Sequence, residues 1–150
     1  MSNILDRDTK ALTGAPQTLT GYAFEARDMN KKRIYVADDD ANILELMKII
    51  LESKGFEVIT SSDGRSLIKL NELPDLVFLD IAMSGSDGSE ICRDFKNQHE
   101  GDGSPVVLVS ANINIHEIGA GCGADAVLPK PFDIRAVVDL ARRFTGTGNN

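Results

Sequence analysis

The feature that most constrains this chain is an alternation of short apolar runs with amphipathic stretches, repeated five times between residues 33 and 144. The apolar runs predict five β-strands, at 33–38, 56–60, 75–80, 105–110 and 124–128. The stretches between and after them predict helices, at 41–53, 63–71, 89–97, 115–121 and 132–144. The runs at 75–80 and 105–110 are almost continuously apolar, as in strands buried on both faces. The pattern therefore predicts an α/β domain with a parallel sheet covered by helices on both sides.

Two of these helices carry more specific expectations. Ser89 is expected to cap the helix at 89–97, because a serine hydroxyl accepts a hydrogen bond from a free N–H group at a helix start. The helix at 41–53 is expected to bury one apolar stripe, made of Ile43, Leu46, Met47, Ile50 and Leu51.

The two ends of the chain differ from the region between them. Residues 1–30 contain few large aliphatic side chains and no sustained pattern, so they are expected to be an N-terminal extension, either flexible or a leader. Met29 stands just before a short basic stretch that leads into the first strand, and we interpret it as a natural start. Residues 31–145 are the expected folded domain, and 146–150 the expected tail.

Charge and cysteine usage narrow the class of protein. The formal net charge is −7, which argues against a nucleic-acid partner and against a polybasic membrane anchor. Cys92 and Cys122 form neither a metal-ligand spacing nor a disulfide framework. Residues 1–30 show no basic stretch followed by an apolar run, so a secretory signal is not expected. We therefore expect a cytoplasmic protein with reduced thiols and no membrane contact.

Reactive side chains gather at the ends of the predicted strands. Asp38 ends the first strand and Asp39 follows it. Asp80 ends the third strand, Ser110 ends the fourth, and Lys130 follows the fifth. The carboxyl ends of parallel strands share one edge of a sheet, where ligands bind. Two carboxylates about 4 Å apart repel by roughly 4 kcal/mol at an effective dielectric of about 20, so a cation is needed among them. Mg²⁺ suits such a site, because it binds a few carboxylates and keeps several waters.

This arrangement suits phosphoryl transfer. A metal ion and the Lys130 ammonium would screen a phosphoryl donor, so that the anionic Asp80 can attack phosphorus. The Ser110 hydroxyl and backbone N–H groups of the loops would then hold the phosphoryl oxygens.

Five segments together resemble the receiver domain of two-component response regulators, and the likeness runs from about residue 32 to residue 144. The resemblance implies a flavodoxin-like three-layer α/β/α sandwich, with a five-stranded parallel sheet in the order 2-1-3-4-5. It implies a phosphoacceptor signalling domain of the stand-alone type rather than an enzyme. The segments are Tyr35–Asp40, Val77–Met83, Asp87–Gly88, Leu108–Ala111 and Leu128–Phe132.

The resemblance also implies a role for each residue of the site. Asp80 accepts a phosphoryl group from the phosphohistidine of a histidine kinase or a histidine phosphotransfer protein. Lys130 pairs with the phosphorylated Asp80, and Ser110 is the switch hydroxyl. The backbone at Ala82 and Ala111 contacts the phosphoryl group. The Mg²⁺ ligands implied are Asp39, Asp80, the carbonyl of Ala82 and, through water, Asp38.

Three departures from the family pattern bear on output. Ser84 replaces the usual proline four residues after the acceptor, which predicts a more mobile loop. Val127 replaces the usual aromatic, and residues 119–123 are rich in glycine. The expected output surface for an unknown partner is the fourth helix, fifth strand and fifth helix.

Two other functions compete with this interpretation. A degenerate receiver would serve only as a docking scaffold for other proteins. A Mg²⁺-dependent phosphatase of the haloacid dehalogenase type would also use a strand-end aspartate, but needs a second acid two residues later, where this chain has Ala82.

Overall fold

The computed structural model describes residues 28–147. Residues 1–27 and 148–150 lie outside the described residues. The N-terminal extension at 1–30 and the tail at 146–150 fall largely on those segments and stay predictions. The natural start at Met29 is not tested by the structure and also stays a prediction.

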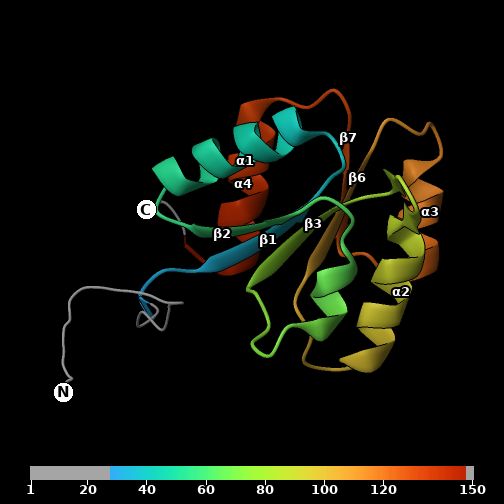
Figure 1. Cartoon of the computed structure of the whole chain (residues 1–150), viewed down its shortest axis with the longest axis horizontal. Coiled ribbons are helices and arrows are strands. Elements are labelled where there is room, and N and C mark those ends of the chain that lie inside the picture. Colours follow the sequence, from blue (N-terminus) through green and yellow to red (C-terminus); the bar gives the residue numbers. More distant parts are fainter. Residues whose placement is uncertain (1–27, 148–150) are drawn as a thin grey trace, which may run out of the picture. The chain divides into compact units, whose positions relative to one another are not determined.

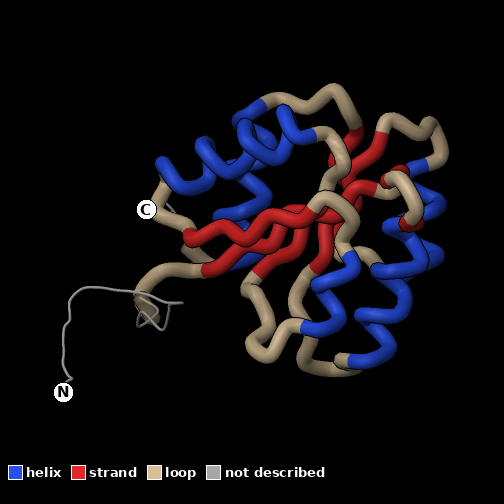
Figure 2. Tube along the Cα trace, in the orientation of Figure 1, coloured by secondary structure: helices blue, strands red, loops and turns tan. Residues whose placement is uncertain are grey.

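A five-stranded parallel sheet forms the centre of the domain (Figure 1). Its strands lie in the order β2-β1-β3-β6-β7, which is the predicted order 2-1-3-4-5 once the strands of this sheet are numbered along the chain. Figure 2 shows these strands in red between two groups of helices. The predicted flavodoxin-like sandwich is confirmed. The strands are β1 (Arg33–Ala37), β2 (Glu57–Ser61), β3 (Leu76–Asp80), β6 (Val106–Ser110) and β7 (Ala126–Pro129).

Within the described residues, three α-helices and one 3₁₀ helix connect the strands of this sheet, and a fourth α-helix follows the last strand. They are α1 (Ala41–Ser53), η2 (Arg65–Lys69), α2 (Gly88–Gln98), α3 (Ile115–Cys122) and α4 (Ile134–Thr145). A small antiparallel hairpin, which the sequence did not predict, joins β4 (Ala82–Met83) to β5 (Ser86–Asp87) just after the central strand β3.

The sheet has a separate apolar core on each face, because successive residues of a strand point to opposite sides. Ile34, Val36 and Phe78 pack with α1 and α4. Tyr35, Ala37 and Leu79 pack with η2, α2 and α3. The central strands are therefore covered on both faces, as their continuous apolar sequence predicts.

Three local predictions were wrong. The expected helix at 63–71 is a five-residue 3₁₀ helix, because Gly64 has a φ of 73° at its start and Leu70 is already extended. Leu46 is 42% exposed, since it lies at the edge of the α1 stripe rather than on its buried centre. The residue that caps α2 is Asp87 and not Ser89, which lies inside the helix.

The early start of α2 follows from a close contact at Gly88. A Cβ atom added to Gly88 would collide with the backbone carbonyl of Asp80. Without a side chain there, α2 begins directly beside the end of β3, and the Asp87 carboxylate accepts a 2.9 Å hydrogen bond from the backbone N–H of Ser89. The hairpin and α2 are thus held against the end of the central strand.

Candidate functional site

Strand register brings the predicted site residues to one edge of the sheet. β1 and β3 pair with Ala37 opposite Leu79, so the next residues, Asp38 just after β1 and Asp80 at the end of β3, lie at the same edge. β6 and β7 pair with Ser110 opposite Pro129. The backbone N–H of Lys130 also donates to the Ser110 carbonyl over 2.9 Å, which fixes the lysine at the same edge.

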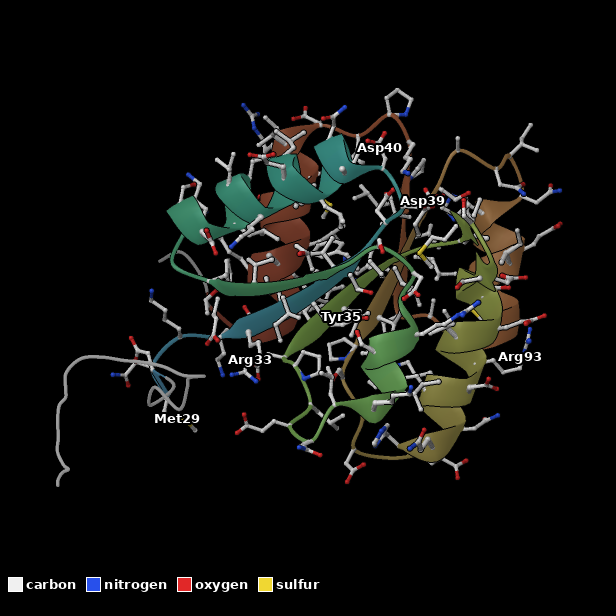
Figure 3. The ribbon with its side chains drawn as sticks, in the orientation of Figure 1. Met29, Arg33, Tyr35, Asp39, Asp40 and Arg93 are labelled. Atoms are coloured by element: carbon white, nitrogen blue, oxygen red, sulfur yellow. The ribbon has the colours of Figure 1, made fainter. Side chains whose placement is uncertain are left out.

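Three carboxylates converge at this edge. One oxygen each of Asp38, Asp39 and Asp80 lies within 4.8 Å of the others. Asp38 and Asp80 are buried, whereas Asp39 is exposed and lies where β1 passes into α1 (Figure 3). The Nζ atom of Lys130 is 2.9 Å from Asp38 Oδ2 and 3.4 Å from Asp80 Oδ2. One ammonium therefore faces three carboxylates, which leaves the cluster short of positive charge.

The excess of negative charge shifts the pKa values of Asp80 and Lys130. Burial, together with the charge of Asp38, raises the pKa of Asp80 from 3.8 to about 6, although Lys130 opposes the rise. Burial acts to lower the pKa of Lys130, but its hydrogen bond to Asp38 and the charges of both acids outweigh burial and raise it. The lysine is therefore protonated at neutral pH.

A pocket of about 470 Å³ collects the predicted site residues. The Ser110 hydroxyl, which lies in it, accepts a 2.9 Å hydrogen bond from the Asn112 N–H. The N–H of Ala82 is 3.4 Å from Asp80 Oδ1. Asp40 caps α1 by accepting from the Asn42 N–H, as expected of a residue at a helix start. The pocket is lined by Asp38, Asp39, Asp40, Asp80, Ile81, Ala82, Ser110, Ala111, Asn112 and Lys130.

The donor set fits Mg²⁺. All the groups that converge are hard oxygen donors, and Mg²⁺ binds such sites through a few carboxylates while retaining waters. The exposure of Asp39 leaves a side of the cluster open to those waters. Asp38, Asp39 and Asp80 are therefore an acidic triad of the kind that holds Mg²⁺.

The contact between Ser84 and Asp39 is a feature of the site that the sequence did not predict. The backbone N–H and the hydroxyl of Ser84 both donate to Asp39 Oδ2, over 2.9 and 3.2 Å. The Arg65 guanidinium donates to the carbonyl of the next residue, Gly85. Ser84 stood out in the sequence only as a departure that predicted a mobile loop, whereas in the structure the turn is held on both sides. No sequence signal reveals a contact between residues 45 positions apart.

No helix within residues 28–147 combines the length and the apolar character that crossing a bilayer requires.

Comparison with known sequences matches residues 34–142 to the response regulator receiver domain. The DNA-binding response regulator MtrA of Mycobacterium tuberculosis is 34% identical over 119 residues, which cover 77% of this chain and 51% of MtrA. The response regulator MprA of Mycolicibacterium vanbaalenii is 36% identical over 114 residues, covering 73% of this chain and 48% of MprA. The chain spans about half the length of these curated relatives.

Solved structures agree with the sequence match. The receiver domain of NtrX from Brucella abortus is 34% identical with a TM-score of 0.67, over 77% of this chain and 99% of that domain. The BeF₃-activated receiver domain of DrrB, a protein of Thermotoga maritima, is 28% identical with a TM-score of 0.69, over 77% and 98%. Members of the response regulator receiver domain family are phosphoacceptor modules of two-component signalling rather than classical enzymes. The sheet order, the acidic triad and these matches show that the chain belongs to this family.

Proposed function

We propose that this domain accepts a phosphoryl group on Asp80 from the phosphohistidine of a histidine kinase or a histidine phosphotransfer protein, in the cytoplasm and with Mg²⁺. The observation that carries the proposal is the convergence of Asp38, Asp39 and Asp80 within 4.8 Å, with Lys130 bridging two of them. Receiver domains work with histidine kinases. Phosphoryl transfer needs a nucleophile beside groups that offset the charge of the phosphoryl oxygens, and these residues would provide both.

The metal site would be formed by Asp39, Asp80 and the Ala82 carbonyl, with Asp38 acting through water. When bound, Mg²⁺ supplies positive charge that offsets the charge of the phosphoryl oxygens. The residues of the chain do the rest. With a pKa of about 6, Asp80 is roughly nine-tenths anionic at pH 7 even without metal, so its carboxylate is ready to attack.

In the transfer, a carboxylate oxygen of Asp80 forms a bond to phosphorus while the bond from phosphorus to the histidine nitrogen breaks. The imidazole leaves with the electron pair of that bond. Lys130 Nζ, which already contacts Asp80 Oδ2, then pairs with the new acyl phosphate. The Ser110 hydroxyl and the N–H groups of Ala82 and Ala111 line the pocket and would hold the phosphoryl oxygens.

Output follows from the position of Ser110. Its hydroxyl oxygen accepts from the Asn112 N–H, in the loop that leads into α3. Turning toward a phosphoryl oxygen weakens that bond and moves the loop. Gly119 lets α3 lie directly on β7, where an added Cβ would come within 2.7 Å of Val127 Cγ1. We propose that a partner reads the surface made by α3, β7 and α4.

The remaining partner predictions concern nucleic acid and the rival functions. MtrA is named as a DNA-binding regulator, but the net charge of −7 favours a protein partner for the present domain. A dehalogenase-type phosphatase would need an acid where this chain has the methyl group of Ala82. A scaffold without phosphorylation would have no need for three carboxylates gathered within 4.8 Å of one another.

The test is phosphorylation by acetyl phosphate with Mg²⁺, followed by intact-mass measurement and phosphotransfer from phosphorylated histidine kinases. The wild type is expected to gain one phosphoryl group and Asp80→Ala none. Asp94→Ala, which removes an exposed acid from α2, is the control and should label normally. Steady turnover of a phosphoester would favour the phosphatase, and an unmodified wild type would favour the scaffold.

A further inference from the structure

The turn of the β4–β5 hairpin contacts the metal site through the backbone and the side chain of Ser84. Ser84 directs two donors, its backbone N–H and its hydroxyl, at the same oxygen of Asp39, with distances of 2.9 and 3.2 Å. Among residues 28–147, these are the hydrogen bonds that the Asp39 carboxylate accepts. The second oxygen, Oδ1, is thus left for a cation.

Asp39 needs such support more than the other two acids. Asp38 and Asp80 are buried, and Lys130 contacts both of them. Asp39 is exposed, so its side chain would otherwise rotate freely and lose that freedom when metal binds. Two donors on one oxygen fix the carboxylate before metal arrives. Hydrogen-bond partners that orient a metal ligand typically change metal affinity by about 10- to 100-fold.

The residue type at position 84 decides whether this support exists. Proline, which the family usually has here, lacks both the N–H and the hydroxyl and leaves Asp39 without either donor. Gly85 follows with a φ of 74°, a value also found after the proline of a type II turn. Ser84→Pro therefore removes the two donors and places at this position the residue that the family usually has there.

We propose that Ser84 is a positioning residue of the Mg²⁺ site: it holds Asp39 Oδ2 so that Oδ1 faces the cation, and it thereby strengthens metal binding. The proposal rests on the proposed function, since it concerns the metal that assists phosphorylation. Loss of both donors in Ser84→Pro is expected to weaken Mg²⁺ binding by about tenfold, the lower end of the usual range. Ser84→Ala keeps the N–H, and its loss is expected to be smaller, about threefold.

The experiment measures the dissociation constant of Mg²⁺ itself, without any phosphodonor, from the shifts of backbone amide NMR signals during titration. Ser86→Ala is the matched control, because Ser86 lies in the same hairpin and its buried hydroxyl has no hydrogen-bond partner among residues 28–147. Asp39→Asn shows the effect of losing the ligand itself. Thermal unfolding of each variant in EDTA checks that the fold is intact.

Weaker binding in the order wild type, Ser84→Ala, Ser84→Pro, with Ser86→Ala equal to wild type, would support the positioning role. Equal or tighter binding in Ser84→Pro would overturn it while leaving the proposed function in place. If Ser84→Pro fails to fold, Ser84→Ala decides, and affinity equal to that of Ser86→Ala overturns the role. A wild type that binds no Mg²⁺ would overturn both this inference and the proposed function.

Discussion

The substitution Asp80→Asn should stabilise the metal-free domain. Asp80 is 4% exposed and shares its surroundings with Asp38, so its negative charge is poorly compensated when no cation is present. Asparagine has nearly the same shape as the protonated acid and carries no charge. The substitution therefore removes the charge and little else.

The raised pKa of Asp80 gives the size of the effect. A change from 3.8 in the unfolded chain to about 6 in the fold corresponds to roughly 3 kcal/mol, at about 1.4 kcal/mol for each factor of ten in proton affinity. Because the folded state binds this proton more tightly, stability falls as pH rises from about 4 to 6 and the loss is complete above that window. Asp80→Asn should recover up to about 3 kcal/mol at pH 7 and almost nothing near pH 4.

The assay is urea unfolding of wild type and Asp80→Asn in EDTA at several pH values between 4 and 7.5. The difference between the two proteins isolates Asp80 from the other acids that titrate in this range. Asp94→Asn removes an exposed charge of the same sign and should show no such pH dependence. Equal stability at pH 7, or a difference that does not vary with pH, would refute the argument that burial and Asp38 destabilise this anion.

Three other substitutions test the surroundings of the site by urea unfolding in EDTA. Lys130→Met leaves Asp38 buried without its 2.9 Å partner and should cost about 3 kcal/mol, and a loss below about 1 kcal/mol would contradict the pairing. Gly88→Ala places a methyl group against the Asp80 carbonyl and should cost about 1–3 kcal/mol, whereas a neutral effect would mean that the helix start can shift. Asp87→Ala removes the α2 cap and should cost about 1 kcal/mol at pH 7. The Ser89 hydroxyl donates to Asp87 and lowers the pKa of this carboxyl below 3.8. The stability that the cap contributes is therefore present above pH 3.8 and is lost as pH falls through the lower pKa of the folded state. If Asp87→Ala still costs stability in strong acid, the capping role is contradicted.

The strands and the acidic cluster could be predicted because they follow from local pattern and parallel topology. An apolar run that ends in Asp80 must place that acid at the carboxyl edge of the sheet, whichever side chains surround it. The bounds of α1, at 41–53, were also predicted, since its apolar residues recur with helical spacing, and the structure adds Asp40 as the cap at its start.

Other features depend on contacts that the sequence does not reveal. Asp87 and Ser89 are both good capping residues, and the choice between them depends on how closely Gly88 approaches the end of β3. The bonds from Ser84 to Asp39 join segments that only the folded chain brings together. Leu46 belongs to the apolar stripe by spacing, but the width of the contact with the sheet leaves it 42% exposed.

The central strand β3 has a consequence for how such a domain can diversify. All five of its residues are buried, and it is hydrogen-bonded to a neighbouring strand on each side. The position of the Asp80 carboxyl at its end is therefore fixed by the sheet. The groups proposed to hold the phosphoryl oxygens, at residues 82 and 111, are exposed and lie beyond the strands of the central sheet. Substitutions in the connecting segments can therefore change the rates at which the phosphoryl group would be gained and lost, at little cost to folding. The strands beneath these segments stay the same.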